Sequence, residues 1–239
     1  MEKVSIAKIK EQIALGMLSD SEIGALQDDS RSGVRALVKR ELNARQAMQR
    51  ELDRVEEMLE FERGLWSRGI EFVAGVDEVG VGPLAGPVIA AAVVLPQNSR
   101  ILGVDDSKKL THKKRQHLAA QIKTEARSFA FGMCSPREID HHNIYQASRL
   151  AMSRAVKNLP KEPGHLLVDA RTVPQTTIAQ TNMIHGDARS YSIAAASILA
   201  KVERDILMER YALDFPGYGF ENHRGYGTAM HLKALRDMG

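Results

Sequence analysis

The segment that decides the fold is Gly75-Val-Asp-Glu-Val-Gly-Val-Gly-Pro-Leu-Ala-Gly-Pro87, where an apolar run enters two carboxylates and then a glycine-rich turn. Carboxylates at the end of an apolar strand are costly unless they are paired or bound to metal. Neighbouring strand residues point to opposite faces, so Asp77 and Glu78 can serve one site only if the strand ends there or one of them contributes backbone oxygen. Gly80 and Gly82 allow the backbone to approach a ligand closely. The alternative is a tight turn with solvated acids.

The same pattern occurs twice more along the chain. His165-Leu-Leu-Val-Asp169 is an apolar run that ends in an acid, and Met183-Ile-His-Gly-Asp187 ends in another just before a helical stretch. A single aspartate at such a point is often a cap, but strand ends are also where sites are built in α/β sheets. Four hard oxygen donors without a His/Cys cluster favour Mg²⁺ or Mn²⁺ over Zn²⁺.

The stretch after Gly69 alternates short apolar runs with helical segments. Strands are predicted at Phe72–Asp77, Val88–Leu95, Phe129–Cys134, His165–Asp169 and Met183–Ile184. Helices are predicted at Lys113–Ser128, Asn143–Asn158 and Ser192–Tyr211. This order predicts an α/β domain with a mixed sheet.

The first part of the chain has the pattern of helices. A capping box is predicted at Ser19–Glu22, and apolar steps of three and four predict a long helix from after Gly33 to about Trp66. We therefore divide the chain into an N-terminal helical extension of residues 1–68 and a main domain of residues 69–239. The extension is either a substrate- or partner-binding appendage or a helical hairpin packed on the main domain.

Composition sets broad limits on the class of protein. The chain has 239 residues, 44% of them hydrophobic and 26% charged, and carries a net charge of +3. Its single cysteine, Cys134, fits a small apolar residue in a strand and a reducing compartment. No run approaches the ~18 apolar residues of a spanning helix, so we expect a cytoplasmic protein without a membrane segment.

Basic residues are concentrated after residue 66, where 22 Lys and Arg face 17 Asp and Glu. This surplus is compatible with a polyanionic partner. Lys108 and Lys109 lie in Asp105-Asp-Ser-Lys-Lys-Leu110 and are candidates for phosphate contacts; helix capping with exposed charge is the alternative. Lys201 and Arg204 lie on the last predicted helix, with a solvated helix face as the alternative.

These motifs together resemble one family. GVDEVGVGPLAGPV, DDSKKL, LLVDA, HGDARSYSIAAASILAKVERD, FPGYGF and GYGT occur in the order and spacing of bacterial ribonuclease HII, the type 2 ribonuclease H, across residues 72–232. The helical part with its DDSRSGV segment is similar to the extension of Gram-positive members. The resemblance implies a ribonuclease-H-like α/β fold with a five-stranded mixed sheet flanked by helices, plus the N-terminal helical extension.

The resemblance also implies a function. It implies an endonuclease that hydrolyses the RNA strand of RNA–DNA hybrids and cuts 5′ of single ribonucleotides embedded in duplex DNA, leaving 3′-OH and 5′-phosphate, in ribonucleotide removal and repair. A cytoplasmic monomer with two Mg²⁺ or Mn²⁺ ions is expected. The implied catalytic and metal-binding residues are Asp77, Glu78, Asp169 and Asp187. The substrate-binding residues are Gly80, Val81, Gly82, Lys108, Lys109 and Tyr226.

Three features depart from the family pattern. Val81 stands where the family usually has arginine, and His185 stands where it usually has lysine. The sequence also ends at Gly239, where relatives generally continue with a basic segment, so we expect a shortened C-terminal segment. The alternative function is therefore a hybrid-binding protein with weak or no cleavage. A related metal nuclease acting on branched DNA is a second alternative, against which the Asp-Glu, Gly-x-Gly and Gly-Tyr-Gly-Thr pattern argues.

Overall fold

The computed structural model describes residues 4–239 and contains two compact units, one ending at Arg54 and the other spanning Val55–Gly239. The first unit is helical, as predicted, and the capping box forms at Ser19 and Glu22. Its helices are α1 (Ile6–Ala14), α2 (Asp20–Ala25) and most of α3 (Ser32–Met58). Its small core consists of Ile9, Ile23, Val34 and Val38.

The second unit is built on a five-stranded sheet, which confirms the predicted fold class. Its strands are β1 (Val73–Val79), β2 (Val88–Val94), β3 (Ser128–Cys134), β4 (His165–Asp169) and β5 (Gln180–Met183). Their order is β3-β2-β1-β4-β5, with β1 antiparallel to β2 and parallel to β4. The sheet is therefore mixed, with β1 at its centre.

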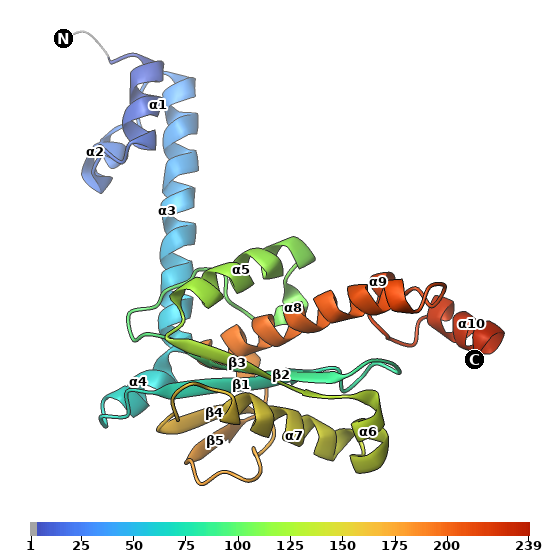
Figure 1. Ribbon diagram of the computed structural model, residues 1–239. Coiled ribbons are helices and arrows are strands. Elements are labelled where there is room, and N and C mark those ends of the chain that lie inside the picture. The colour runs from blue at the N-terminus through green and yellow to red at the C-terminus, as the bar shows by residue number, and fades with distance from the viewer. Residues whose placement is uncertain (1–3) are drawn as a thin grey trace. The chain divides into compact units, whose positions relative to one another are not determined.

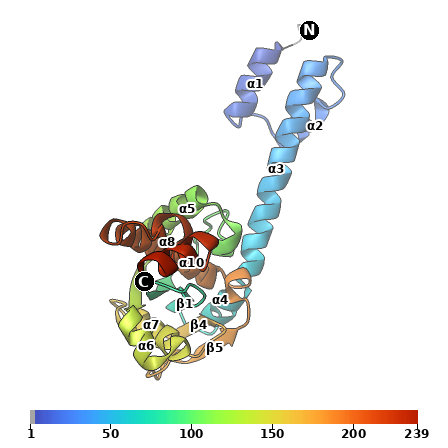
Figure 2. The same cartoon turned by 90° about the vertical axis from the view of Figure 1, so that its right-hand side faces the viewer.

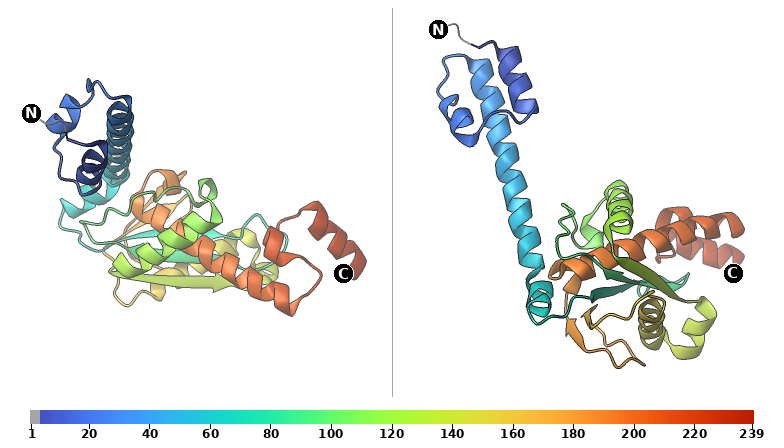
Figure 3. Two further views of the ribbon diagram at one scale, coloured as in Figure 1. Left: turned by 90° about the horizontal axis from the view of Figure 1, so that it is seen from above. Right: turned by 60° about the vertical axis from the view of Figure 1, so that its left-hand side comes forward.

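Helices cover both faces of this sheet (Figures 1 and 2). One face carries α8 (Tyr191–Asp214) and α5 (His112–Glu125), and the other carries α7 (Ile144–Lys157), with α6 (Pro136–His142) beside it. The right panel of Figure 3 shows the same layering, and its left panel looks down on α8 and α5 lying over the strands. Alternate residues of β2 enter the two cores: Ala91 and Val93 belong to the α8 side, and Ala90 and Ala92 to the α7 side. This explains why β2 is an unbroken apolar run.

Two glycines allow these helices to approach the sheet closely. A Cβ atom at Gly75 would lie 2.1 Å from the carbonyl carbon of Ser192 in α8. A Cβ at Gly132 would lie 2.1 Å from the carbonyl oxygen of Ala151 in α7. Any side chain at either position would force the helix away from the sheet.

Some element boundaries differ from the predictions. The long helix does not run unbroken to Trp66: α3 ends at Met58, and a separate helix α4 (Glu60–Trp66) follows. The sequence pattern also did not predict α9 (Phe220–His223) and α10 (Ala229–Met238), which close the chain, or the short helices η1 (Ser107–Lys109) and η2 (Gly186–Ala188). Within residues 4–239, no helix combines the length and apolar character needed to cross a membrane.

Candidate active site

The four predicted carboxylates come from three elements that meet near one end of the central strands. Asp77 and Glu78 lie in β1, Asp169 ends β4, and Asp187 lies in η2 just before α8. Since Val76 pairs with Val168 in the parallel ladder, Asp77 and Asp169 are the next residues along the two strands. The amide of Gly186 donates to Oδ1 of Asp169 at 2.7 Å, which ties the turn carrying Asp187 to the end of β4.

Asp77 and Glu78 point to opposite faces of the sheet, because β1 continues to Val79 instead of ending between them. Their cross-strand partners, Ala91 and Ala90, belong to the cores on the α8 side and the α7 side. The strand does not end at the acids, so of the two conditions for one shared site only the second remains, a backbone oxygen contributed by Asp77 or Glu78. The two carboxylates flank the end of the sheet instead.

Asp77 is a buried carboxylate, and among residues 4–239 no Lys, Arg or His nitrogen lies within ion-pair distance of it; Lys108, which pairs with Asp187, interacts with Asp77 from farther away. Burial, followed by the charges of Glu78 and Asp169, holds its pKa well above the usual range, against a hydrogen bond from Ser197 on α8. Removing a charged group from water and placing it beside like charges both favour its neutral form. This position therefore favours any cation that can replace the lost solvation.

Glu78 differs because it forms an ion pair with Arg171, which follows β4. Burial raises the pKa of Glu78, the Arg171 guanidinium opposes that effect, and the charge of Asp169 adds to it. Only 9% of the Glu78 side chain and 24% of the Arg171 side chain are exposed, so solvent screens this pair little. Arg171 is a site residue that the sequence analysis did not identify.

The two candidate lysines point in different directions. The Nζ atom of Lys108 lies 3.5 Å from Oδ2 of Asp187, so Lys108 belongs to the carboxylate cluster. Lys109 instead donates to Asp105 at 3.2 Å. Burial raises the pKa of Asp187 and the charge of Asp106 adds to it, whereas Lys108 lowers it.

The donor set fits a hard divalent cation, although the carboxylates do not converge into a finished metal cage. Across residues 4–239, no three His, Cys, Asp or Glu side chains are close enough together to hold one metal ion. The oxygen-only ligands are nevertheless those that Mg²⁺ and Mn²⁺ take. The raised pKa values of Asp77, Glu78 and Asp187 also mark a place where added positive charge would be stabilising.

The predicted substrate-binding glycine loop lies beside Tyr226. Gly80 has φ +102°, and a Cβ there would lie 2.4 Å from the carbonyl oxygen of Pro87, so this position requires glycine. A Cβ at Gly82 would lie 3.7 Å from the ring of Tyr226, which is 44% exposed. Val81 is half-buried and packs against the core on the α7 side. The structure thus brings these predicted residues together, with Val81 turned partly inward.

The ribonuclease HII family model matches residues 74–239, and the model of the ribonuclease HII N-terminal domain matches residues 5–66. The chain belongs to the ribonuclease HII family. A ribonuclease HII from Ligilactobacillus salivarius is 45% identical over 239 residues, covering 100% of this chain and 93% of that protein. These matches confirm the family resemblance and establish the chain as a ribonuclease H enzyme.

Solved structures agree with this assignment. The ribonuclease H2 of Pyrococcus horikoshii OT3 has a TM-score of 0.59 and 28% identity, covering 68% of this chain and 84% of that one. A Bst ribonuclease HIII solved in complex with Mn²⁺ has a TM-score of 0.56 at 20% identity, covering 70% of each chain. The second likeness shows a shared fold only.

Arg204 holds the backbone that follows the predicted glycine loop. Its side chain is fully buried, which excludes the solvated-face alternative at this position. Its guanidinium donates to the carbonyl oxygens of Pro87 at 3.0 Å, Ala85 at 3.0 Å and Arg224 at 2.9 Å. The spacing of seven residues from Ser197, on the same helix face, was a signal that could have placed it inward.

Glu62 is a second residue that the sequence did not reveal. Its buried carboxylate accepts hydrogen bonds from Oγ of Ser190 at 2.7 Å and the amide of Ser192 at 2.9 Å, at the start of α8. Burial raises the pKa of Glu62, while the hydrogen bonds from Ser192 and Ser190 oppose that effect. Because η2 directly precedes α8, this contact helps to fix the turn that carries Asp187.

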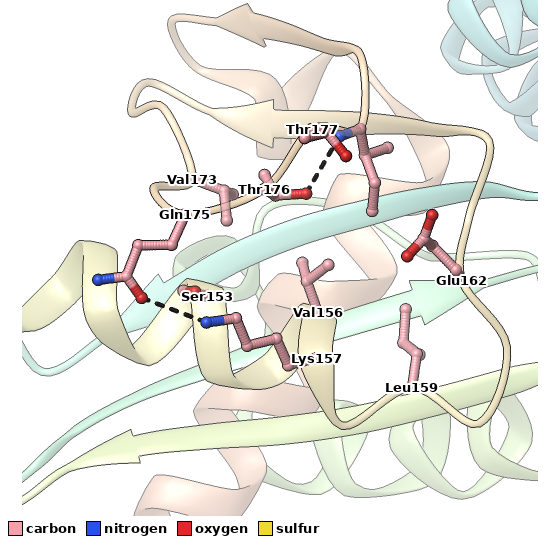
Figure 4. A pocket seen from close by; sticks show the side chains of 10 residues that line it. Ser153, Val156, Lys157, Leu159, Glu162, Val173, Gln175, Thr176 and Thr177 are labelled. Atoms are coloured by element: carbon pink, nitrogen blue, oxygen red, sulfur yellow. Dashed lines mark hydrogen bonds between the residues drawn. The ribbon is translucent and has the colours of Figure 1, made fainter.

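A separate pocket of about 640 Å³ lies between α7 and the segment that follows β4 (Figure 4). Lys157 donates to Gln175 at 3.2 Å at this pocket. Its lining residues are Ser153, Val156, Lys157, Leu159, Glu162, Val173, Gln175, Thr176, Thr177 and Ile178. None of the four carboxylates is among them, so the strand-end acids, and not this hollow, mark the candidate active site.

Proposed function

We propose that this chain is an endonuclease that hydrolyses the RNA strand of RNA–DNA hybrids and cuts 5′ of single ribonucleotides embedded in duplex DNA, leaving 3′-OH and 5′-phosphate. Its role would be ribonucleotide removal during replication and repair. The observation that carries the proposal is the placement of Asp77 beside Asp169 at the strand ends, as a buried carboxylate that forms no ion pair among residues 4–239. The glycine loop and exposed Tyr226 supply a surface for the sugar–phosphate backbone.

The cofactors we propose are two Mg²⁺ or Mn²⁺ ions held by Asp77, Glu78, Asp169 and Asp187. When bound, such ions make water nucleophilic at neutral pH and stabilise a leaving oxygen. Lys108 and Arg171 neutralise Asp187 and Glu78 in the present arrangement. Both cations would have to release these carboxylates as the site loads.

The remaining residues would recognise the substrate. The backbone amides of Gly80 and Gly82 would bind the 2′-hydroxyl, the group that distinguishes RNA from DNA. Tyr226 would stack on the deoxyribose beyond the junction, and Lys108 and Lys109 would contact phosphates. All of these groups belong to one chain, so a monomer would suffice.

The decisive experiment compares cleavage of four duplexes in Mg²⁺ and in Mn²⁺. They carry one embedded ribonucleotide, a full RNA strand, DNA alone and a DNA branch. Cutting of the first two alone, with a 3′-OH on the 5′ side of the ribonucleotide, supports the proposal. Cutting of the branch alone would favour the branched-DNA nuclease, and tight hybrid binding without cutting would favour a binding protein. Val81 is the observation behind the last alternative, because valine cannot make the charged contact of the family's usual arginine.

We further propose that residues 1–68 act as an accessory substrate-binding extension of a catalytic domain at residues 69–239. A deletion that tests this should stop at Arg54, since the second compact unit begins at Val55 and Glu62 holds the start of α8. Weaker hybrid binding with unchanged kcat would support the accessory role. Unchanged affinity would indicate that the extension has another purpose.

A further inference from the structure

Tyr226 lies in a loop whose backbone is attached to the glycine loop. The amides of Leu84 and Ala85 both donate to the carbonyl oxygen of Gly225, at 2.9 and 3.3 Å. A Cβ at Gly225, where φ is +86°, would lie 2.2 Å from the carbonyl oxygen of Ala85. The position of the Tyr226 ring beside Gly82 therefore depends on how the backbone on either side of Tyr226 is held.

Two stacked histidines hold that backbone. The rings of His223 and His231 lie 4.5 Å apart with an angle of 16° between them. Nδ1 of His231 is 3.0 Å from the carbonyl oxygen of Tyr226, and Nδ1 of His223 accepts from the amide of Gly225 at 3.1 Å. One ring thus contacts the residue before Tyr226 and the other contacts Tyr226 itself.

These contacts define which nitrogen atoms donate and which accept. A carbonyl oxygen only accepts, so Nδ1 of His231 carries the proton that binds Tyr226. Nδ1 of His223 accepts from an amide, so its proton lies on Nε2, which is 2.8 Å from the carbonyl oxygen of Tyr218. Because Nδ1 of His223 accepts, the His223 ring is neutral in this arrangement, and no repulsion between two charged rings opposes the stack.

The burial of His231 leaves one of its two ring nitrogens without a partner. The side chain has no exposed surface, and its Nε2 atom is buried without a hydrogen-bond partner within residues 4–239. A buried nitrogen without a partner is destabilising. A phenyl ring would avoid that cost and keep the edge contact with Phe220, whose ring centre is 5.5 Å away. What phenylalanine could not supply is the proton donated to Tyr226.

We propose that His231 is a positioning residue for substrate recognition: with His223 stacked on it, it fixes the backbone of Tyr226 so that the exposed ring meets the sugar next to the cleaved junction. This inference rests on the proposed function, in which Tyr226 contacts the substrate. His231 touches neither substrate nor metal in this scheme. It acts only through Tyr226.

The test compares His231→Phe with His231→Asn. Phenylalanine keeps the ring and removes the donor, whereas the asparagine amide can place a donor near the position of Nδ1. We expect His231→Phe to lower kcat/KM on the embedded-ribonucleotide duplex by about fivefold, mostly through KM, without a lower Tm. His231→Asn should lower Tm and retain kcat/KM within about twofold. A merely structural role would make activity follow Tm instead.

A double-mutant cycle with Tyr226→Ala decides whether the effect passes through Tyr226. The loss from His231→Phe should vanish in the Tyr226→Ala background, and His223→Phe should behave the same way if His231→Phe fails to fold. An equal loss in both backgrounds, or wild-type efficiency of His231→Phe, overturns the inference while leaving the proposed cleavage intact. If the chain binds hybrids without cutting them, the proposed cleavage is wrong. The inference is then still tested by measuring the hybrid dissociation constants of the same four proteins.

Discussion

At the end of β1, two neighbouring carboxylates lie on opposite faces of the sheet and have different surroundings. On the α8 side, Asp77 is buried with a hydrogen bond from Ser197 and like charges nearby. On the α7 side, Glu78 is buried against the guanidinium of Arg171. Among residues 4–239, Glu78 forms an ion pair with a cation, whereas Asp77 forms none and interacts with Lys108 only from a greater distance.

This difference separates two ways of keeping an acid inside a protein. The charge of Glu78 is balanced by Arg171, so removing Glu78 breaks an ion pair of the fold as well as deleting a proposed metal ligand. Asp77 has no ion pair to offset its burial, so its charge destabilises the metal-free fold. An acid that only destabilises the empty protein is expected to serve a bound cation, and the two faces should respond differently to mutation.

The largest effect is expected from Asp77→Asn. Loss of this carboxylate should lower the single-turnover cleavage rate in saturating Mg²⁺ by about a thousandfold or more, because metal charge contributes several kcal/mol to transition-state stability. Without metal, the Tm should stay level or rise, since a buried repulsive charge is gone. Asp105→Asn, which removes a carboxylate paired with Lys109, is the matched control and should cleave normally. Near-wild-type turnover of Asp77→Asn would contradict the assignment.

Arg171→Met tests the ion pair of Glu78 on the α7 side of the sheet. It should reduce the free energy of unfolding at pH 7 by about 1–3 kcal/mol, because Glu78 is left buried without its cation. The pKa of Glu78 should rise further above its ordinary value of 4.5. A folded-state pKa above the unfolded one makes an acid lose stability as pH rises, so the variant should lose more at pH 8 than at pH 5.

Urea unfolding at both pH values measures this loss. The matched variant is Arg171→Met combined with Glu78→Gln, in which the unpaired charge no longer exists and most of the loss should disappear. A pH-independent loss that persists in the double variant would mean that Arg171 contributes packing alone. Glu78 would then resemble Asp77 more closely than the ion pair indicates.

The sequence predicted much of this arrangement because hydrophobic periodicity is local. The apolar run of β2 and the alternating helices follow from neighbouring residues, and strands ending in acids indicated where a site would form. It could not decide where β1 ends, because that depends on pairing with β2 through Val79 and Ile89. The opposite orientations of Asp77 and Glu78 were therefore left as two possibilities.

Contacts between residues far apart in the sequence could not be predicted from local sequence patterns. Arg171 meets Glu78 across 93 positions of sequence, and Arg204 meets Pro87 across 117. Such contacts depend on strand order and on the close approach of α8 that Gly75 allows. Burial of an arginine is uncommon enough that its sequence neighbours alone gave equal weight to a solvated position.

A smaller effect is expected from Lys108→Ala, which removes the cation that pairs with Asp187 and interacts with Asp77. Hybrid binding should weaken with salt, and the slope of log Kd against log salt should fall by about one unit in this variant. Lys109→Ala is its neighbouring comparison, because Lys109 pairs with Asp105 away from the carboxylates. Fluorescence anisotropy with uncleavable hybrid across a salt series measures both slopes. A salt-independent wild-type Kd would rule out an interface dominated by phosphates.

The smallest effect is expected from Val81→Arg, on the α7 side where Glu78 lies. Val81 is half-buried against the core, so the aliphatic part of an arginine can cover the same surface while its head reaches solvent. A guanidinium there can make a forked contact with a phosphate that valine cannot make. The cost of repacking around position 81 offsets part of the free energy of this contact, so kcat/KM should rise by about three- to tenfold. The preference for a 2′-hydroxyl should not change, because backbone amides at Gly80 and Gly82 would read it.

Val81→Lys is the matched variant, since it adds the same charge without the fork and should gain less. An increase shared equally by both variants would point to general attraction for a polyanion. No increase in either folded variant would mean that the inward packing of Val81 keeps this position away from the substrate. The glycine loop would then recognise substrate through its backbone alone. The α7 side of the sheet would contribute Glu78 to the site, but position 81 would make no charged contact with a phosphate.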